Sequence, residues 1–112
     1  MKTPKNKFEL KYLKLLTKLK VRPQYEPDKL PYVYSGHYTP DFKIFTPSGI
    51  IYLETKGYFR PEHKRVMAAA KRTNPALDIR IIFYAKKLKD IKWAEKYGFP
   101  WAVDEVPKEW LL

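Results

Sequence analysis

Residues 39–57 have the sequence TPDFKIFTPSGIIYLETKG. Two runs rich in β-branched and aromatic residues, 41–45 and 50–56, flank the turn-forming segment Thr46-Pro47-Ser48-Gly49. Proline and glycine inside a short loop between two such runs are typical of a β-hairpin. We therefore predict a hairpin at the centre of the fold, with Gly57 ending its second strand.

The second strand of this hairpin places different chemistry on its two faces. Successive side chains of a strand point to opposite sides, so Ile51 and Leu53 share one face. The other face carries Tyr52, Glu54 and Lys56. A surface ion pair is one explanation for a carboxylate and an ammonium two residues apart, and a catalytic site is the other.

Asp41 supplies a second carboxylate at the same end of the hairpin, because pairing of the two strands can bring it close to Glu54. Two converging carboxylates repel unless a cation neutralises them, and Mg²⁺, or Mn²⁺ in its place, prefers such ligands. The backbone carbonyl of Thr55 is a further candidate ligand. One or two such ions can activate water for attack on phosphate, while Lys56 orients the water or offsets charge. The pattern Pro40-Asp41…Glu54-x-Lys56 therefore indicates a PD-(D/E)xK nuclease.

The segments outside the hairpin predict helices and a further strand. Apolar residues recur at helical spacing over residues 5–20, and residues 32–34 are β-like before a turn at Ser35-Gly36. Residues 61–72 begin with proline and predict a helix, residues 77–84 a buried strand, and residues 87–97 a last helix ending at Gly98. These elements predict a single α/β domain over residues 1–112, with a small mixed β-sheet flanked by helices and a restriction-endonuclease-like core.

The chain is strongly basic. It has 23 Lys and Arg residues against 12 Asp and Glu residues, for a formal net charge of +11. This excess favours a polyanionic partner, nucleic acid above all, because each neutralised phosphate releases counterions. No stretch is apolar enough to span a membrane, residues 1–10 lack the apolar core of a signal peptide, and the absence of cysteine excludes disulfides and zinc fingers. We expect a cytoplasmic nucleic-acid-binding protein, although ribosomal and architectural proteins share this charge.

Glu9 and a set of basic residues are further candidates. Glu9 is the only acidic residue in residues 1–24, and it could form a local ion pair or deliver a third carboxylate to the metal site. His63 could be a general base or a phosphate contact, although a lone histidine at a helix start is usually neither. Basic side chains on the predicted helices could hold DNA phosphates without reading sequence, or simply form solvated helix faces. The candidates are Lys11, Lys14, His63, Lys64, Arg65, Lys71 and Arg72.

Six segments together resemble the phage endonuclease I family, the four-way (Holliday) junction resolvases of T-odd phages. They are YTPDF at 38–42, GI at 49–50, ETKG at 54–57, NPALDIRIIF at 74–83, AEKYG at 94–98 and PKEW at 107–110. The similarity covers nearly the whole chain in the same order, so it is more specific than the nuclease motif alone.

The resemblance implies roles for individual residues. It implies that Asp41 and Glu54 bind divalent metal, that Lys56 is catalytic, and that Glu9 completes the site from the first helix. It also implies an intertwined homodimer in which the first helix serves the active site of the partner. Relative to the family, we expect this protein to lack a long basic N-terminal extension and a basic C-terminal tail. Its hairpin between Asp41 and Glu54 is somewhat longer, and the link from Glu9 to Asp41 is somewhat shorter. These departures bear on the dimer and on DNA contacts more than on the metal site.

The expected function is therefore cleavage of branched double-stranded DNA by a structure-selective, divalent-metal-dependent endonuclease. Two alternatives stay open from the residues themselves. A PD-(D/E)xK nuclease can act on linear duplex DNA, and a protein with this fold can bind nucleic acid without cutting it.

Overall fold

The hairpin predicted within residues 39–57 is present. The computed structural model describes residues 7–19, 23–25, 30–32 and 36–112. Strands β4 (Phe42–Thr46) and β5 (Gly49–Lys56) run antiparallel, with Phe42 opposite Leu53. Gly49 has a φ of 139°, a conformation that residues with a side chain rarely adopt, which explains the glycine at this turn. The hairpin is thus confirmed, and its first strand begins one residue later than predicted.

β5 lies at the centre of a five-stranded mixed sheet with the strand order β1-β4-β5-β6-β7. The edge strand β1 (Gln24–Tyr25) is antiparallel to β4, whereas β6 (Ile79–Phe83) and β7 (Trp101–Val103) continue parallel to β5. Parallel neighbours need long crossovers, and α2 (Pro61–Thr73) and α3 (Leu88–Lys96) supply them. The predicted fold class, α/β with a small mixed sheet flanked by helices, is confirmed.

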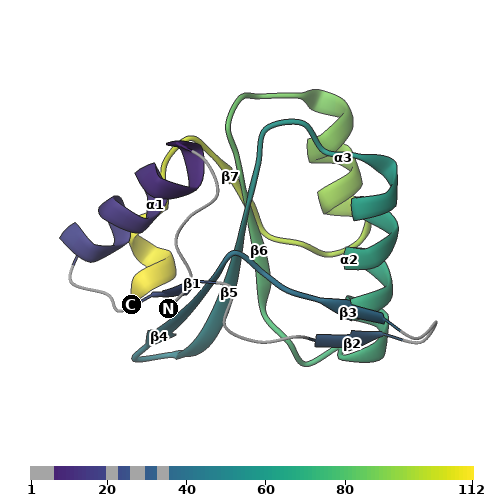
Figure 1. The fold of residues 1–112 in the computed structure, drawn as a ribbon, viewed down its shortest axis with the longest axis horizontal. Coiled ribbons are helices and arrows are strands. Elements are labelled where there is room, and N and C mark those ends of the chain that lie inside the picture. Colours follow the sequence, from purple (N-terminus) through teal and green to yellow (C-terminus); the bar gives the residue numbers. More distant parts are fainter. Residues whose placement is uncertain (1–6, 20–22, 26–29, 33–35) are drawn as a thin grey trace.

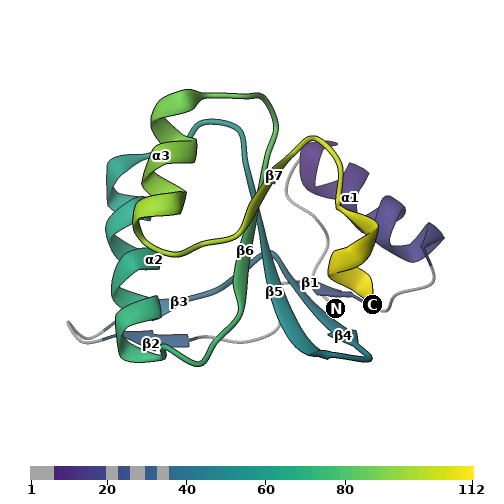
Figure 2. The same ribbon diagram turned by 180° about the vertical axis from the view of Figure 1, so that it is seen from behind.

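The remaining elements cover the sheet on both sides. Helix α1 (Lys7–Lys18) and the 3₁₀ helix η1 (Lys108–Leu111) lie on the side opposite to α2 and α3 (Figures 1 and 2). Strands β2 (Leu30–Tyr32) and β3 (Gly36–Tyr38) form a separate antiparallel pair beside one end of α2 (Figure 1). The sheet is therefore sandwiched between two helical layers.

Each face of the sheet has its own apolar core. On the α1 side, Tyr12 and Leu16 are fully buried against Phe42, Ile51 and Leu53. On the other side Tyr52 joins a cluster with residues of α2, β6 and α3. Burying a side chain such as Leu16 contributes about 1.5–3 kcal/mol, so these cores fix how α1 and α2 sit on β5. Because alternate residues of β5 enter different cores, Glu54 and Lys56 face the α2 side.

The structure differs from the sequence predictions mainly in its short elements. Strands β1, β3 and β7 and the helix η1 were not predicted, because two to four residues are too few to show a periodicity. Tyr32 ends β2 instead of beginning a strand, and Gly36 begins β3 instead of lying in a turn. The predictions for residues 5, 6, 20 and 33–35 lie outside the described residues. None of the helices in the described ranges has the length and apolarity needed to cross a membrane.

Candidate active site

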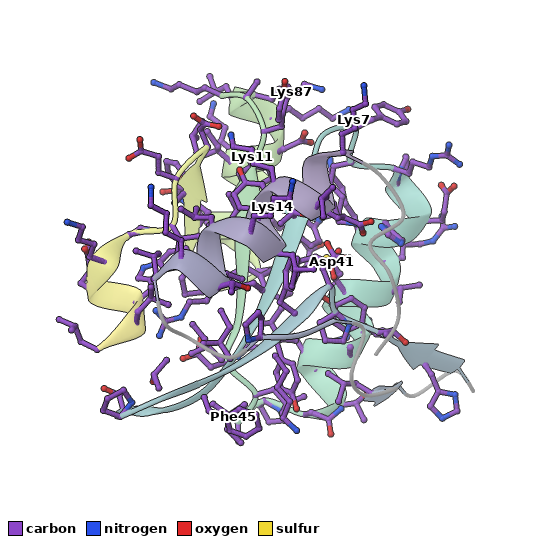
Figure 3. The ribbon with its side chains drawn as sticks, turned by 60° about the vertical axis from the view of Figure 1, so that its left-hand side comes forward. Lys7, Lys11, Lys14, Asp41, Phe45 and Lys87 are labelled. Carbon is purple, nitrogen blue, oxygen red and sulfur yellow. The ribbon has the colours of Figure 1, made fainter. Side chains whose placement is uncertain are left out.

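One pocket brings together most of the residues that the sequence singled out. It has a volume of about 880 Å³ and lies where the end of β5 meets α1, β3 and the start of α2. Figure 3 shows Asp41 between α1 and α2. The predicted site residues that line it are Glu9, Asp41, Glu54, Thr55, Lys56 and His63.

Asp41 is held at the edge of the sheet by the neighbouring strand. It lies directly before β4, and the hairpin register that pairs Phe42 with Leu53 brings it level with Glu54 and next to Thr55. The Asp41 Oδ2 accepts hydrogen bonds from the Thr55 backbone N–H and from the Thr55 hydroxyl, both at 2.9 Å. The carboxyl group of Asp41 is therefore oriented by two donors, and the residue is only 8% exposed.

Glu54 and Lys56 form a buried ion pair on the α2 side of β5. Their exposed fractions are 2% and 6%, which is unusual because charged side chains are seldom buried unless they are paired. The Lys56 Nζ lies 3.1 Å from the Glu54 Oε2, and the Tyr38 hydroxyl donates to the Glu54 Oε1 at 2.6 Å. Lys56 also lies over the ring of Phe59, 5.4 Å from its centre, and its Nζ contacts the Nδ1 of His63.

The electrostatics of the pocket favour added positive charge. Burial, followed by the negative charge of Glu54, raises the pKa of Asp41 from 3.8 to about 9, and Glu9 adds to this while the Thr55 hydrogen bonds oppose it. Burial and then Glu54 also raise the pKa of the Tyr38 hydroxyl. A carboxyl that is driven to hold a proton beside a second carboxylate is a site where a cation can replace that proton.

The donor set fits a hard divalent cation held by few protein ligands. Asp41 and Glu54 offer carboxylate oxygens, which Mg²⁺ prefers, and Mg²⁺ commonly keeps several waters beside one or two carboxylates. In the described part of the chain no three Asp, Glu or His side chains form a group that could hold a metal by themselves. The residues therefore fit a metal bound by the Asp41–Glu54 pair, with Glu9 lining the same pocket.

Glu9 reaches the pocket from α1 of the same chain. The helix is anchored on its own sheet by the buried side chains of Tyr12 and Leu16. The Tyr12 hydroxyl donates to the backbone carbonyl of Asp104 at 2.8 Å, and Lys11 forms a 2.6 Å ion pair with the Asp104 carboxylate. A single chain can thus bring its own Glu9 to the pocket.

The predicted DNA-binding residues divide into two groups. Lys64 forms a largely buried ion pair with Asp90 at 2.8 Å, and Lys71 donates to the carbonyl of Leu77 at 2.5 Å. Both side chains therefore have structural partners that DNA would have to displace. The other candidates are more accessible. Lys11, although paired with Asp104, and Lys14 are exposed along α1 (Figure 3), His63 lines the candidate active-site pocket, and Arg65 and Arg72 line a groove between α2 and α3.

Sequence reasoning missed the supporting contacts of the site. Tyr38 was not singled out as a site residue, although it is buried in the core and orients Glu54 through a hydrogen bond. The Thr55 side chain was not singled out, although its hydroxyl holds Asp41. Neither contact has a local signal in the sequence. Each joins segments that are distant along the chain, Tyr38 with Glu54 and Asp41 with Thr55.

Comparison with known proteins places this chain in a family. The model of the phage endonuclease I family matches residues 3–112. The chain is 35% identical over 114 residues to endonuclease I of Escherichia phage T7, an alignment that covers 92% of this chain and 74% of that protein. It is 34% identical over 110 residues to endodeoxyribonuclease 1 of Enterobacteria phage T3, covering 88% and 70% respectively. The chain that folds Asp41, Glu54 and Lys56 into one pocket belongs to the phage endonuclease I family.

Proposed function

We propose that this protein is an endonuclease that resolves four-way (Holliday) and other branched DNA junctions by Mg²⁺-dependent hydrolysis of phosphodiester bonds. The observation that carries the proposal is the convergence of buried Asp41, Glu54 and Lys56 in one pocket of a phage endonuclease I family member. The names of its relatives, endonuclease I and endodeoxyribonuclease 1, support a nuclease that acts on DNA.

Asp41 and Glu54 are the residues that would hold the metal, with the backbone carbonyl of Thr55 and the carboxylate of Glu9 as further oxygen donors. When bound there, Mg²⁺, one or two ions per site, would supply a Lewis acid for the phosphate and would make a water molecule easier to deprotonate. Thr55 fixes the direction of the Asp41 carboxyl, and Tyr38 fixes that of Glu54. Both carboxylates are thus preorganised by neighbours that do not react.

Lys56 provides a positive charge on the α2 side of β5, next to Glu54. Its ammonium group is a hydrogen-bond donor, so it can orient an attacking water or stabilise the negative charge that develops on the phosphate. Its burial strengthens this effect, because charges interact more strongly where water is excluded. Loss of Lys56 should therefore reduce the rate of cleavage more than the affinity for DNA.

The charge of the chain supports binding of a long polyanion across the pocket. The net charge of +11 attracts DNA, and Lys7, Lys11 and Lys14 are carried by α1 (Figure 3), the helix that brings Glu9 to the pocket. Such contacts with phosphates position a duplex without reading its sequence. The preference for a junction is proposed from the resemblance to junction resolvases, and the charge does not bear on it.

We propose in addition that the working form is a homodimer with two sites. A junction offers pairs of equivalent strands, and a two-fold dimer presents two equivalent pockets to them. In an intertwined dimer, α1 of one chain would make the contacts with the other chain that it makes here with its own sheet. Glu9 would then complete the partner's pocket.

Cleavage of two labelled substrates tests this function. An end-labelled four-way junction and a linear duplex of the same sequence are each incubated with Mg²⁺ and with chelator. We expect Mg²⁺-dependent cuts near the branch point of the junction and little cutting of the duplex. Equal cutting of both substrates would indicate a nuclease without selectivity for junctions. A gel shift of the junction without cutting, with Mn²⁺ also tried, would indicate a module that binds DNA and does not cut it.

A further inference from the structure

We infer that His63 is a positioning residue for Lys56: it holds the lysine ammonium group in the pocket by accepting a hydrogen bond at Nδ1. The inference rests on the proposed function, because it assigns His63 a part in the same reaction. The sequence had offered His63 as a DNA phosphate contact or a general base. The structure favours a different role, because the Nδ1 atom faces the Lys56 Nζ.

The chain is built so that His63 returns to the end of β5. Phe59 is almost fully buried and anchors the loop after Gly57 by edge-on packing against Trp93, with ring centres 5.0 Å apart. Pro61 then starts α2, and the Lys64 backbone N–H donates to the carbonyl of Arg60 at 3.1 Å. His63 therefore lies in the first turn of α2, and the contacts that place its backbone do not involve Lys56.

The hydrogen-bonding chemistry decides the direction of the contact. An ammonium group has donors only, so the Nδ1 of His63 must accept and the ring proton must reside on Nε2. Consistently, partial burial of the ring, followed by the charge of Lys56, lowers the pKa of His63. The neutral ring is the form that can hold the lysine.

A second partner matters because the first one has another task. The carboxylate partner of Lys56 is Glu54, at 3.1 Å, and Glu54 is also the proposed metal ligand. If Glu54 binds a metal, its carboxylate is less available to Lys56. The long and flexible lysine side chain then needs another fixed acceptor to remain in place. His63 supplies one from α2, an element that carries neither Asp41 nor Glu54.

Three substitutions distinguish positioning from other roles. In His63→Asn, the amide oxygen can occupy the place of Nδ1. In His63→Gln, the longer side chain carries its amide toward the place of Nε2. His63→Ala has no polar group at either place. We expect the single-turnover cleavage rate at saturating protein to fall about 10–100-fold in the Ala and Gln variants, as misplacement of a catalytic group does. The Asn variant should stay within about threefold of the wild type because it keeps the acceptor. Junction affinity should change little in all three.

Each other pattern overturns the inference. Equal loss of rate in the Asn and Ala variants would deny a role for an acceptor at Nδ1, and wild-type rates in all three would deny any role in catalysis. A loss of junction affinity at an unchanged saturated rate would instead make His63 a phosphate contact. Thermal melting of each variant establishes that it is folded.

An NMR titration of His63 in the metal-free protein tests the pairing without any cleavage. The Lys56→Met substitution should raise the pKa of His63, because it removes the neighbouring positive charge. Lys92→Met, at an exposed position of α3, should leave it unchanged. An unchanged pKa of His63 in Lys56→Met would overturn the pairing whatever the activity of the protein. Failure of the wild-type chain to cut any DNA would instead count against the proposed function, and the two failures are thus distinguishable.

Discussion

Replacing Asp41 with asparagine should make the metal-free protein more stable at alkaline pH, although it should abolish the proposed activity. The substitution keeps the oxygen that accepts the Thr55 hydrogen bonds and removes the charge. In the folded protein, burial and the nearby carboxylates of Glu54 and Glu9 raise the pKa of Asp41 to about 9. Ionisation of Asp41 therefore lowers the free energy of unfolding of the wild type as the pH rises. The variant, which has no carboxyl group at this position, should not show this loss.

The sign and size of the effect follow from the linkage of protonation and folding. A carboxyl with a raised pKa in the folded state stabilises the fold fully below its unfolded pKa of 3.8, and this stability is lost as the pH rises toward about 9. Each pH unit in that window costs about 1.4 kcal/mol at most. Between pH 5 and pH 8 the ceiling is about 4 kcal/mol, and relaxation and water entry should reduce it to about 1–3 kcal/mol.

Urea denaturation in the presence of chelator at pH 5 and pH 8 measures this difference. The free energy of unfolding of the Asp41→Asn variant, relative to the wild type, should rise by about 1–3 kcal/mol between the two pH values. The matched substitution Asp78→Asn removes a partly exposed carboxylate paired with Arg80, and its small effect should be the same at both. If the Asp41→Asn difference is also independent of pH, Asp41 is not a desolvated member of a carboxylate cluster and the reasoning is refuted.

Three further predictions concern the dimer, the support of Glu54 and the DNA interface. Refolding a mixture of inactive Glu9→Ala and Asp41→Ala chains should restore nicking if α1 is exchanged between the chains. If mixed dimers form but nicking does not recover, Glu9 serves the pocket of its own chain. Tyr38→Phe should lower the free energy of unfolding by about 1–3 kcal/mol and slow cleavage, because the buried Glu54 carboxylate loses a donor; unchanged urea midpoints and rates would contradict this. Junction affinity should fall steeply with salt concentration, and Lys14→Ala should reduce the slope of log affinity against log salt by about one if this side chain contacts a phosphate, whereas an identical slope would place Lys14 outside the interface.

The central part of the fold could be predicted because its signals are local. Pro47 and Gly49 mark the hairpin turn, and strict alternation in residues 51–56 assigns each side chain of β5 to a face. Pro61 marks the start of α2 within the same short range. In each case a few residues that are adjacent in the sequence determine the backbone conformation, so the sequence is sufficient to predict it.

The remaining features depend on contacts between distant segments. β7 exists because Trp101–Val103 pairs with β6, and three residues carry no periodicity of their own. The same holds for the candidate site: the PD…ExK pattern predicted Asp41, Glu54 and Lys56, but not the residues that hold them. His63 contacts Lys56 across the loop that joins β5 to α2, in which Phe59 is buried.

The most direct test of the account is single-turnover cleavage of a labelled four-way junction by the wild type, Asp41→Ala and Glu54→Ala. Junction affinity is measured in parallel by gel shift in the presence of chelator. We predict Mg²⁺-dependent cleavage by the wild type, loss of cleavage by more than about 10³-fold in both variants, and affinities within several fold of the wild type. Full cleavage activity in either variant would contradict the assignment of the two carboxylates to a catalytic metal site.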